Sequence, residues 1–215
     1  MGWQALLEAM DGLQGIGMGI PAALEQHARS GEGVSRDLAE EWQLHRWRLG
    51  DPAAAMRALA PNARGPYDRF VLEVLVLCLE RPSADHRRML TVALARLRAA
   101  RFEGDRPRGA AAVLRLALVL VALTAGEDLG NATERTVAAF GRRRLRRLRA
   151  TLERVERSAA PPARAIENVL RTQRLHDRRG SWLALSRAAG LALAITLTAL
   201  TVIVGGSAGL GVAGW

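Results

Sequence analysis

Apolar residues recur with helical spacing through most of the first 180 positions, and alternation with a period of two is almost absent. Proline and glycine separate the apolar stretches at short intervals. The sequence therefore predicts an all-α fold, a multi-helix bundle. Helices are predicted over residues 3–11, 21–30, 36–49, 53–60, 69–80, 86–102, 110–125, 132–157 and 164–179.

Several helix ends carry recognisable signals. Pro21 stands in the first turn of a helix, where its missing amide hydrogen is tolerated. Ser35 is a predicted N-cap for the helix over 36–49, and Gly50 a predicted end of that helix. Asp51 and Pro52 then fit the N-cap and first position of the next helix.

Two successive stretches, 69–102 and 110–157, share one pattern of an apolar helix, a short polar turn and a basic amphipathic helix. This similarity indicates a duplicated helical hairpin. The apolar helix over 110–125 has two interpretations, a second membrane span or a buried core helix. We favour the buried helix, because the stretch contains Arg115 and is shorter than the ~20 residues that cross a bilayer.

Residues 188–215 contain no charged side chain. Their first part, 188–204, consists mainly of Leu, Ile, Val, Ala and Thr, and flanking residues extend it to the ~20 needed to cross a bilayer. The sequence predicts a single C-terminal transmembrane helix over 182–206 and a glycine-rich tail over 207–215. The chain is thus expected to be tail-anchored.

The flanks of this segment predict its orientation. Arginines precede the span and none follows it, so the positive-inside rule places residues 1–181 in the cytoplasm of a bacterium, at the inner membrane. Trp182 and Trp215 are predicted interface-belt residues on the two sides. Gly190 and Ala194 lie on a smooth side of small residues, which favours close packing against a helix of another membrane subunit.

Charge is distributed unevenly over the 215 residues, whose formal net charge is +10. Residues 1–60 carry five arginines and eight acidic residues, whereas residues 142–187 carry fourteen arginines and four acidic residues. A basic block indicates phosphates, either of nucleic acid or of lipid headgroups. Because the predicted span follows closely, we favour anionic phospholipids, bound by Arg142, Arg143, Arg146, Arg147, Arg171, Arg174, Arg178, Arg179 and Arg187.

The arginine-rich stretch is also predicted to be an ordered helix. Leu145, Leu148, Leu152 and Val155 follow one another at spacings of three, four and three, which forms a narrow apolar seam. This seam predicts packing against the bundle, with arginines around the rest of the helix.

No residue pattern indicates catalysis. The four histidines, His27, His45, His86 and His176, are scattered, and no metal or cofactor is expected. A phosphate-binding loop and a nucleophile elbow are both missing from the sequence. The single cysteine, Cys78, is predicted to be a small buried apolar residue. We therefore expect no enzyme.

Together these patterns divide the chain into five parts. The expected parts are an N-terminal helical subdomain (1–60), a helical-hairpin bundle with a long basic helix (61–157), a basic juxtamembrane helix (158–181), the transmembrane helix (182–206) and the tail (207–215).

Three stretches resemble the F-family of inner-membrane platform proteins of type II secretion and type IV pilus machinery, in particular the Tad-pilus branch. They are "GIGMGIPAALEQHA", "WRLGDPAAAMRALA" and "ALVLVALTAGEDLGNATERTVAAFGRRRLRRLRATLE". The resemblance implies a cytoplasmic six-helix bundle and a non-enzymatic scaffold that links a cytosolic assembly ATPase to the membrane. Family members have several spans, however, and residues 61–109 add helices that do not align.

The expected function is a non-enzymatic membrane scaffold or accessory subunit, whose partners are other membrane-protein subunits. Two alternatives remain open, a membrane-tethered nucleic-acid-binding protein and an accessory subunit of a photosynthetic or respiratory complex. Nucleic acid is the weaker expectation, because Trp182 is the one aromatic residue between 142 and 187 that could stack on a base.

Overall fold

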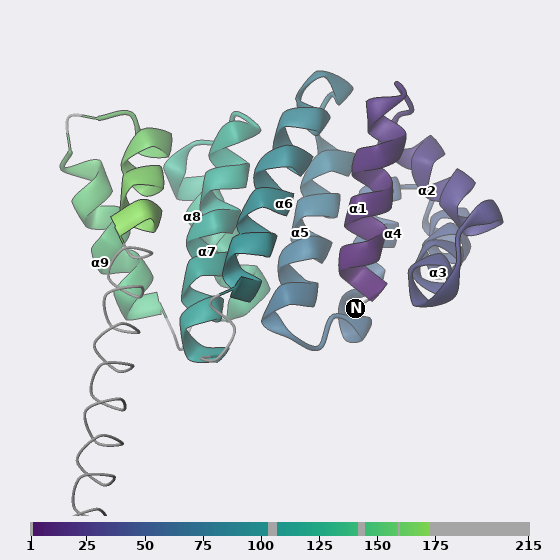
Figure 1. The fold of residues 1–215 in the computed structure, drawn as a ribbon, viewed down its shortest axis with the longest axis horizontal. Helices are drawn as coiled ribbons and strands as arrows, with labels where there is room; N and C mark the ends of the chain where they lie inside the picture. Colours follow the sequence, from purple (N-terminus) through teal and green to yellow (C-terminus); the bar gives the residue numbers. More distant parts are fainter. Residues whose placement is uncertain (1, 103–106, 142–144, 159, 173–215) are drawn as a thin grey trace, which may run out of the picture. The chain divides into compact units, whose positions relative to one another are not determined.

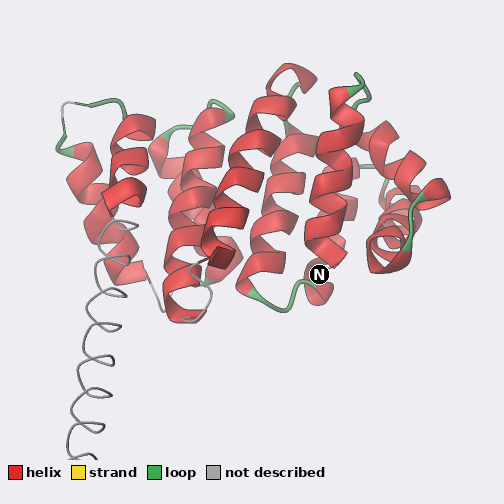
Figure 2. Cartoon of the chain, in the orientation of Figure 1, coloured by secondary structure: helices red, strands yellow, loops and turns green. Residues whose placement is uncertain are grey.

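The computed structural model describes residues 2–102, 107–141, 145–158 and 160–172, and these residues form helices and short connections without a strand (Figure 2). The all-α prediction is confirmed. The described helices are α1 (Gly2–Gly15), α2 (Ile20–Ser30), α3 (Gly33–Leu49), α4 (Pro52–Ala58), α5 (Pro66–Glu80), α6 (His86–Phe102), α7 (Pro107–Thr124), α8 (Leu129–Phe140) and α9 (Leu145–Glu156), with 3-10 turns η1 (Ala60–Asn62) and η2 (Ser83–Asp85) and a helical stretch over 162–172.

Residues 1–170 form one compact unit, and residues 171–215 are the second. In the first unit the helices stand side by side, with α2 and α3 at one end and α9 at the other (Figure 1). The helices do not follow one another in space in their sequence order, because α1 lies next to α5 and α6 as well as next to α2 and α3. α1 packs against α2 and α3 on one side and against α5 and α6 on the other.

A continuous apolar core runs through this first unit and receives side chains from every labelled α-helix. α7 is its most deeply buried element: apolar residues from Ala110 to Ala122 are almost all inaccessible to solvent, and the helix packs against α5, α6, α8 and α9. The stretch 110–125 is therefore a buried core helix. No helix in the described part of the chain is both long and apolar enough to cross a membrane.

The structure confirms some predicted helix ends and corrects one. Gly50 ends α3 in the left-handed conformation, with φ of 74°. The Asp51 carboxylate accepts hydrogen bonds from the amides of Ala53 and Ala54, both at 3.1 Å, and so caps α4. The predicted Ser35 cap is wrong, because α3 begins at Gly33 and the capping position falls on Glu32. Ser35 lies inside the first turn and its hydroxyl donates to the Glu32 carbonyl.

The predicted single helix over 132–157 is also wrong. α8 ends at Phe140, Gly141 adopts a positive φ of 79°, and α9 begins at Leu145. The positive φ directs the backbone out of the α-helical path, so the chain changes direction here. The apolar seam is nevertheless confirmed for Leu148, Leu152 and Val155, which are all buried, and α9 contacts α7.

Candidate functional site

A cluster of charged side chains links three helices on one side of the core. Arg135 of α8 lies at its centre: its Nη2 atom is 2.7 Å from Glu80 and 2.7 Å from Glu127, and its Nη1 atom is 4.0 Å from Glu73. Arg81 lies 3.3 Å from Glu127, and Arg57 of α4 pairs with Glu80. We call these three arginines and three glutamates the Arg135 network.

The strength of the ion pairs in the Arg135 network depends on how far the side chains are buried. The Glu127 side chain is only 4% exposed, and those of Arg135, Glu73 and Glu80 are 19–23% exposed, so water screens the pairs poorly. Burial raises the pKa of Glu73, and the nearby charges of Arg135 and Arg57 offset part of that rise. The network balances three positive and three negative groups, which is typical of a structural device that joins α4, α5 and α8.

Glu73 makes the stability of the protein depend on pH. A carboxyl group with a raised folded-state pKa stabilises the fold below its ordinary pKa and loses that contribution as the pH rises through the raised value. We therefore expect Glu73→Gln to unfold at a higher temperature than the wild type at pH 7. Near pH ~2.5, roughly two units below the ordinary glutamate pKa, the carboxyl is protonated in both states and we expect the two to unfold together.

Thermal unfolding of the full-length chain at both pH values checks this expectation. Glu134→Gln, at an exposed site on α8, is the control and leaves the difference between the two pH values unchanged. A Glu73→Gln variant that unfolds at a lower temperature at pH 7 would show that the charged form of Glu73 is stabilising.

A second feature is an open groove of about 330 Å³ at the α3 end of the unit. The residues around it come from the start of α1, from one face of α3, from η1 and from the start of α5. Trp3 donates from Nε1 to the Asn62 carbonyl at 3.4 Å, and Asn62 donates from Nδ2 to Glu41 at 2.6 Å, which joins these elements. The lining residues are Gly2, Trp3, Val34, Asp37, Leu38, Glu41, Asn62 and Asp68.

The close approach of α1 and α3 beside this groove depends on a glycine. A Cβ atom at Gly2 would lie 2.5 Å from Val34 Cγ1, closer than side chains pack. Three carboxylates, those of Asp37, Glu41 and Asp68, share the groove with the apolar side chains. They do not form a group that could hold a metal ion, nor does any other set of residues in the described ranges.

Exposed apolar side chains gather at the same end of the unit. Trp47 is 89% exposed, although it lies on the same helix as Trp42, which is fully buried. Among the residues whose exposure the structure describes, the other large apolar side chains that stand out into solvent are Ile16, Val34, Leu44 and Leu49. Leu44 and Trp47 are neighbours at a spacing of three on α3, and exposed apolar side chains that lie together are typical of a protein-binding site.

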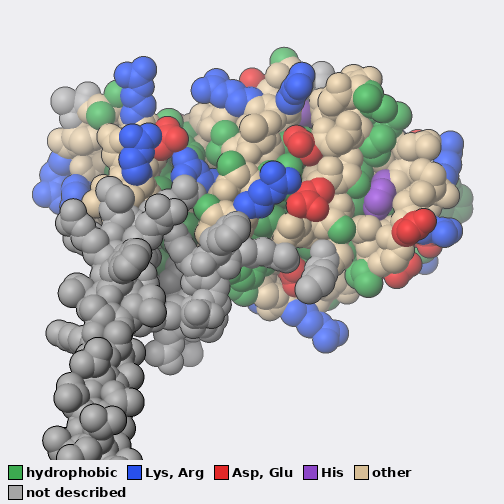
Figure 3. Space-filling view, in the orientation of Figure 1, with side chains coloured by type: hydrophobic (Ala, Val, Ile, Leu, Met, Phe, Trp, Pro, Cys, Tyr) green, Lys and Arg blue, Asp and Glu red, His purple; other side chains and the backbone are tan. Residues whose placement is uncertain are grey.

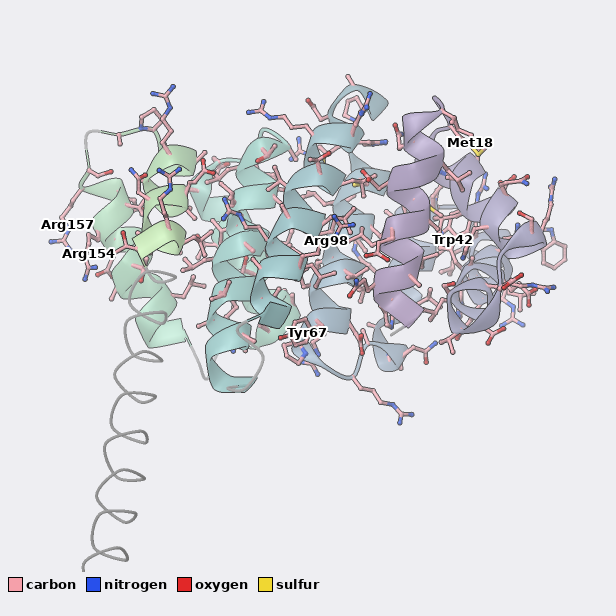
Figure 4. The ribbon with its side chains drawn as sticks, viewed as in Figure 1. Met18, Trp42, Tyr67, Arg98, Arg154 and Arg157 are labelled. Atoms are coloured by element: carbon pink, nitrogen blue, oxygen red, sulfur yellow. The ribbon has the colours of Figure 1, made fainter. Side chains whose placement is uncertain are left out.

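Basic side chains are spread over this face of the unit, and several of them lie around α9 (Figure 3, blue). Arg154 and Arg157 lie on the outer side of α9, and Trp42 of α3 lies at the far end of the helix row (Figure 4). Arg154, Arg157 and Arg164 are all exposed. Glu153 and Glu156 are exposed beside Arg154 and Arg157, so the described surface of the α9 end is of mixed charge, whereas the groove at the α3 end is lined by carboxylates.

The predicted lipid-binding arginines are placed only in part. Arg146 and Arg147 lie in α9, and Arg171 is exposed in the helical stretch over 162–172. The remaining predicted site residues lie outside the described ranges. They are Arg142, Arg143, Arg174, Arg178, Arg179, Arg187, Trp182, Trp215, Gly190 and Ala194.

Two further polar groups have structural explanations. His27 Nε2 lies 3.0 Å from the Ser35 hydroxyl, but that hydroxyl also donates to the Glu32 carbonyl, so the pair joins α2 to the start of α3. Burial lowers the pKa of His27. Cys78 is fully buried as predicted, and burial raises the pKa of its thiol to about 12, so the thiol is unreactive at neutral pH.

Sequence reasoning missed both the Arg135 network and the groove, because their members are separated by up to 78 positions and meet only in the fold. The sequence did contain one indication of the apolar surface, because Trp47 follows Leu44 at a spacing of three on a predicted helix. No protein-family model, curated protein or solved structure matches the chain.

Proposed function

We propose that the protein is a non-enzymatic, membrane-tethered scaffold that holds other subunits of a membrane complex. The observation that carries this proposal is the exposed apolar patch around Trp47 and Leu44 at one end of a well-packed helical unit. Proteins that act as monomers seldom leave a tryptophan 89% exposed beside other apolar side chains. The patch supports a protein partner.

The membrane tether is the second part of the proposal and rests on the sequence. The uncharged stretch over 188–215 follows a basic stretch, which is the arrangement of a span with a cytoplasmic flank. The arginines around α9 support contact with anionic headgroups, where each contributes about 1 kcal/mol when it lies near the surface.

The resemblance to secretion and pilus platform proteins suggests a more specific form of this role. In that form the helical unit would link a cytosolic assembly ATPase to the inner membrane. The all-helical first unit is compatible with this role, and the apolar patch is a suitable contact surface for such a partner.

Substituting arginine at two central positions of the proposed span should release the protein from the membrane. Each arginine at the centre of a transmembrane helix costs about 2.5–3.5 kcal/mol. We expect the wild type to remain in the membrane pellet after extraction at alkaline pH. The variant Leu193→Arg/Leu197→Arg should move to the supernatant.

The matched control is Leu193→Val/Leu197→Val, which keeps the segment apolar and should stay in the pellet. Native gel electrophoresis of the wild type in mild detergent tests the scaffold role, with migration above the isolated chain as the expected result. Wild-type protein found in the alkaline supernatant would remove the tether from the proposal, and migration as an isolated chain would remove the scaffold.

A further inference from the structure

The helices from α5 to α9 alternate in direction, so their ends fall into two groups. The Tyr67 hydroxyl in the first turn of α5 donates to the Ala100 carbonyl in the last turn of α6 at 3.1 Å, which joins the start of one helix to the end of the other. Arg81, directly after α5, lies 3.3 Å from Glu127 in the connection between α7 and α8. The starts of α5, α7 and α9 therefore share one end of the helix row with the ends of α6 and α8 (Figure 1).

This end of the row has an excess of arginines, and we call it the basic end. Within the terminal turns of α5–α9 and the two positions beyond each of them, the described residues of this end include six arginines and one acidic residue, Asp68. Arg64 and Arg69 belong to the start of α5 and are exposed. The other four stand in the last turn of α6 and the first turns of α7 and α9, and they are Arg101, Arg108, Arg146 and Arg147. Residues 103–106 and 142–144, outside the described ranges, contain four arginines and two acidic residues, so they do not reverse the sign.

The opposite end of the same helices has no such excess. By the same count it carries five arginines and six acidic residues, so the net charge is +5 at the basic end and −1 at the opposite end. α9 itself changes sign along its length, because Glu153 and Glu156 accompany Arg154 in its last turn. A surface whose charge has one sign attracts a partner of the opposite sign. The basic end therefore fits an anionic partner.

The chain leaves the first unit in the direction of the basic end. The helical stretch that begins at residue 162 runs back from the opposite end toward the basic end (Figure 1). The sequence continues with a basic stretch and then with the uncharged residues 188–215, which include the proposed span. A surface beside the entry of a span faces lipid headgroups, and each arginine near an anionic leaflet adds to the attraction. The nearness of the proposed span favours lipid phosphates over those of nucleic acid.

We propose that the basic end of the first unit lies on the surface of an anionic bilayer, so that α5–α9 stand end-on to the membrane. The partner is a layer of anionic phospholipid, such as phosphatidylglycerol. The starts of α5, α7 and α9 add the partial positive charge of their helix dipoles at the same end. The carboxylates of the groove belong to α3 and to the start of α5, so the ends of α6–α9 provide most of the contact and Arg64 and Arg69 its edge. This inference rests on the proposed membrane tether and adds the orientation of the unit.

Energy transfer from a dye to the bilayer measures this orientation in the full-length chain, reconstituted into vesicles whose headgroups carry the acceptor. Ala60→Cys places the dye in η1, shortly before α5 starts, and Ala84→Cys places it in η2, shortly after α5 ends. Both alanines are exposed, and Cys78 does not compete for the dye because it is fully buried and its thiol has a pKa of about 12. The length of α5, about 22 Å, separates the two sites.

In vesicles that contain phosphatidylglycerol, energy transfer should be larger from position 60 than from position 84. The difference should shrink between about 0.1 M and about 1 M salt, because the Debye length falls from about 10 Å to about 3 Å. It should also shrink in vesicles of phosphatidylcholine alone, since their surface has no net charge.

Charge removal at the two ends provides matched variants of the labelled chain. Arg64→Gln/Arg69→Gln should lower the salt concentration at which half of the difference is lost. Arg87→Gln/Arg88→Gln removes the same charge at exposed sites of the opposite end and should leave that concentration unchanged. Flotation with phosphatidylcholine vesicles tests the tether separately: a chain that does not float with them but keeps the difference on phosphatidylglycerol loses the tether and retains the surface contact.

Three results would overturn the proposal. The first is equal transfer from the two positions on phosphatidylglycerol vesicles, or larger transfer from position 84. The second is a difference that neither salt nor the lipid headgroup changes. The third is salt-dependent binding of a DNA duplex by a chain whose two dyes transfer equally, which would assign the basic end to nucleic acid.

Discussion

Replacing Trp42 with alanine is expected to lower the free energy of unfolding by about 3–5 kcal/mol, the usual cost of removing a large aromatic side chain from a core. Trp42 is fully buried, its Nε1 atom donates to the Pro52 carbonyl at 3.0 Å, and the Arg46 guanidinium lies 5.3 Å from its ring centroid. The substitution therefore leaves a cavity between α3 and α4 and removes the hydrogen bond to the Pro52 carbonyl. Thermal unfolding of the full-length chain, followed by circular dichroism, should show a fall of roughly 6–20 °C.

Trp47→Ala is the matched control, because it makes the same substitution five residues later on the same helix. Trp47 is 89% exposed, so its loss should change the free energy of unfolding by no more than about 0.5 kcal/mol. Equal destabilisation by the two substitutions would mean that Trp47 is buried in the folded protein, and would also remove the apolar patch on which the proposed contacts depend.

The Arg135 network should produce the second large effect. Arg135→Met keeps most of the side-chain volume but leaves Glu127, which is 4% exposed, with Arg81 as its remaining partner at 3.3 Å. Removing the closer partner of a buried carboxylate is costly, so we expect a loss of about 3 kcal/mol in the free energy of unfolding. Urea unfolding of the full-length chain measures this loss as a lower midpoint.

A surface pair provides the comparison for Arg135. Arg36 and Glu40 lie 2.7 Å apart on α3 and are 48% and 46% exposed, so Arg36→Met should cost less than about 1 kcal/mol. Similar costs for Arg135→Met and Arg36→Met would show that water screens the network as well as it screens a surface pair.

Local signals predicted much of the helical framework. Proline and glycine have fixed backbone consequences that do not depend on the rest of the fold, which is why Pro21, Gly50 and the pair Asp51–Pro52 were read correctly. Ser35 failed for the opposite reason. A serine near a helix start can act at several positions, and contact with His27 of the preceding helix places it inside the first turn.

The helix end at Gly141 was not predicted from the periodicity of apolar residues. The apolar seam of α9 continues the pattern of α8 closely enough to suggest one helix, and glycine inside a helix costs only about 1 kcal/mol. α8 nevertheless ends before Gly141, and Leu148, Leu152 and Val155 are buried in the core as part of a separate helix.

The candidate surfaces were less accessible to sequence reasoning than the helices. The net charge pointed to the arginines near residue 142, but it gave no indication that Asp37, Glu41 and Asp68 would share one groove. Charge counts describe a segment, whereas a binding surface depends on which segments become neighbours. The Arg135 network was hidden for the same reason, since α4, α5 and α8 meet only in the folded unit.

The position of α1 has a consequence for the order in which the protein folds. Its buried face, which includes Leu6, Leu7 and Met10, packs against α5 and α6, and Glu8 lies 3.7 Å from Arg98. A ribosome adds about 5–20 residues each second, so α1 waits several seconds for these partners to be synthesised. During that interval the apolar face of α1 is open to chaperones, and the amino-terminal half cannot reach its native packing before residue 98 has been added.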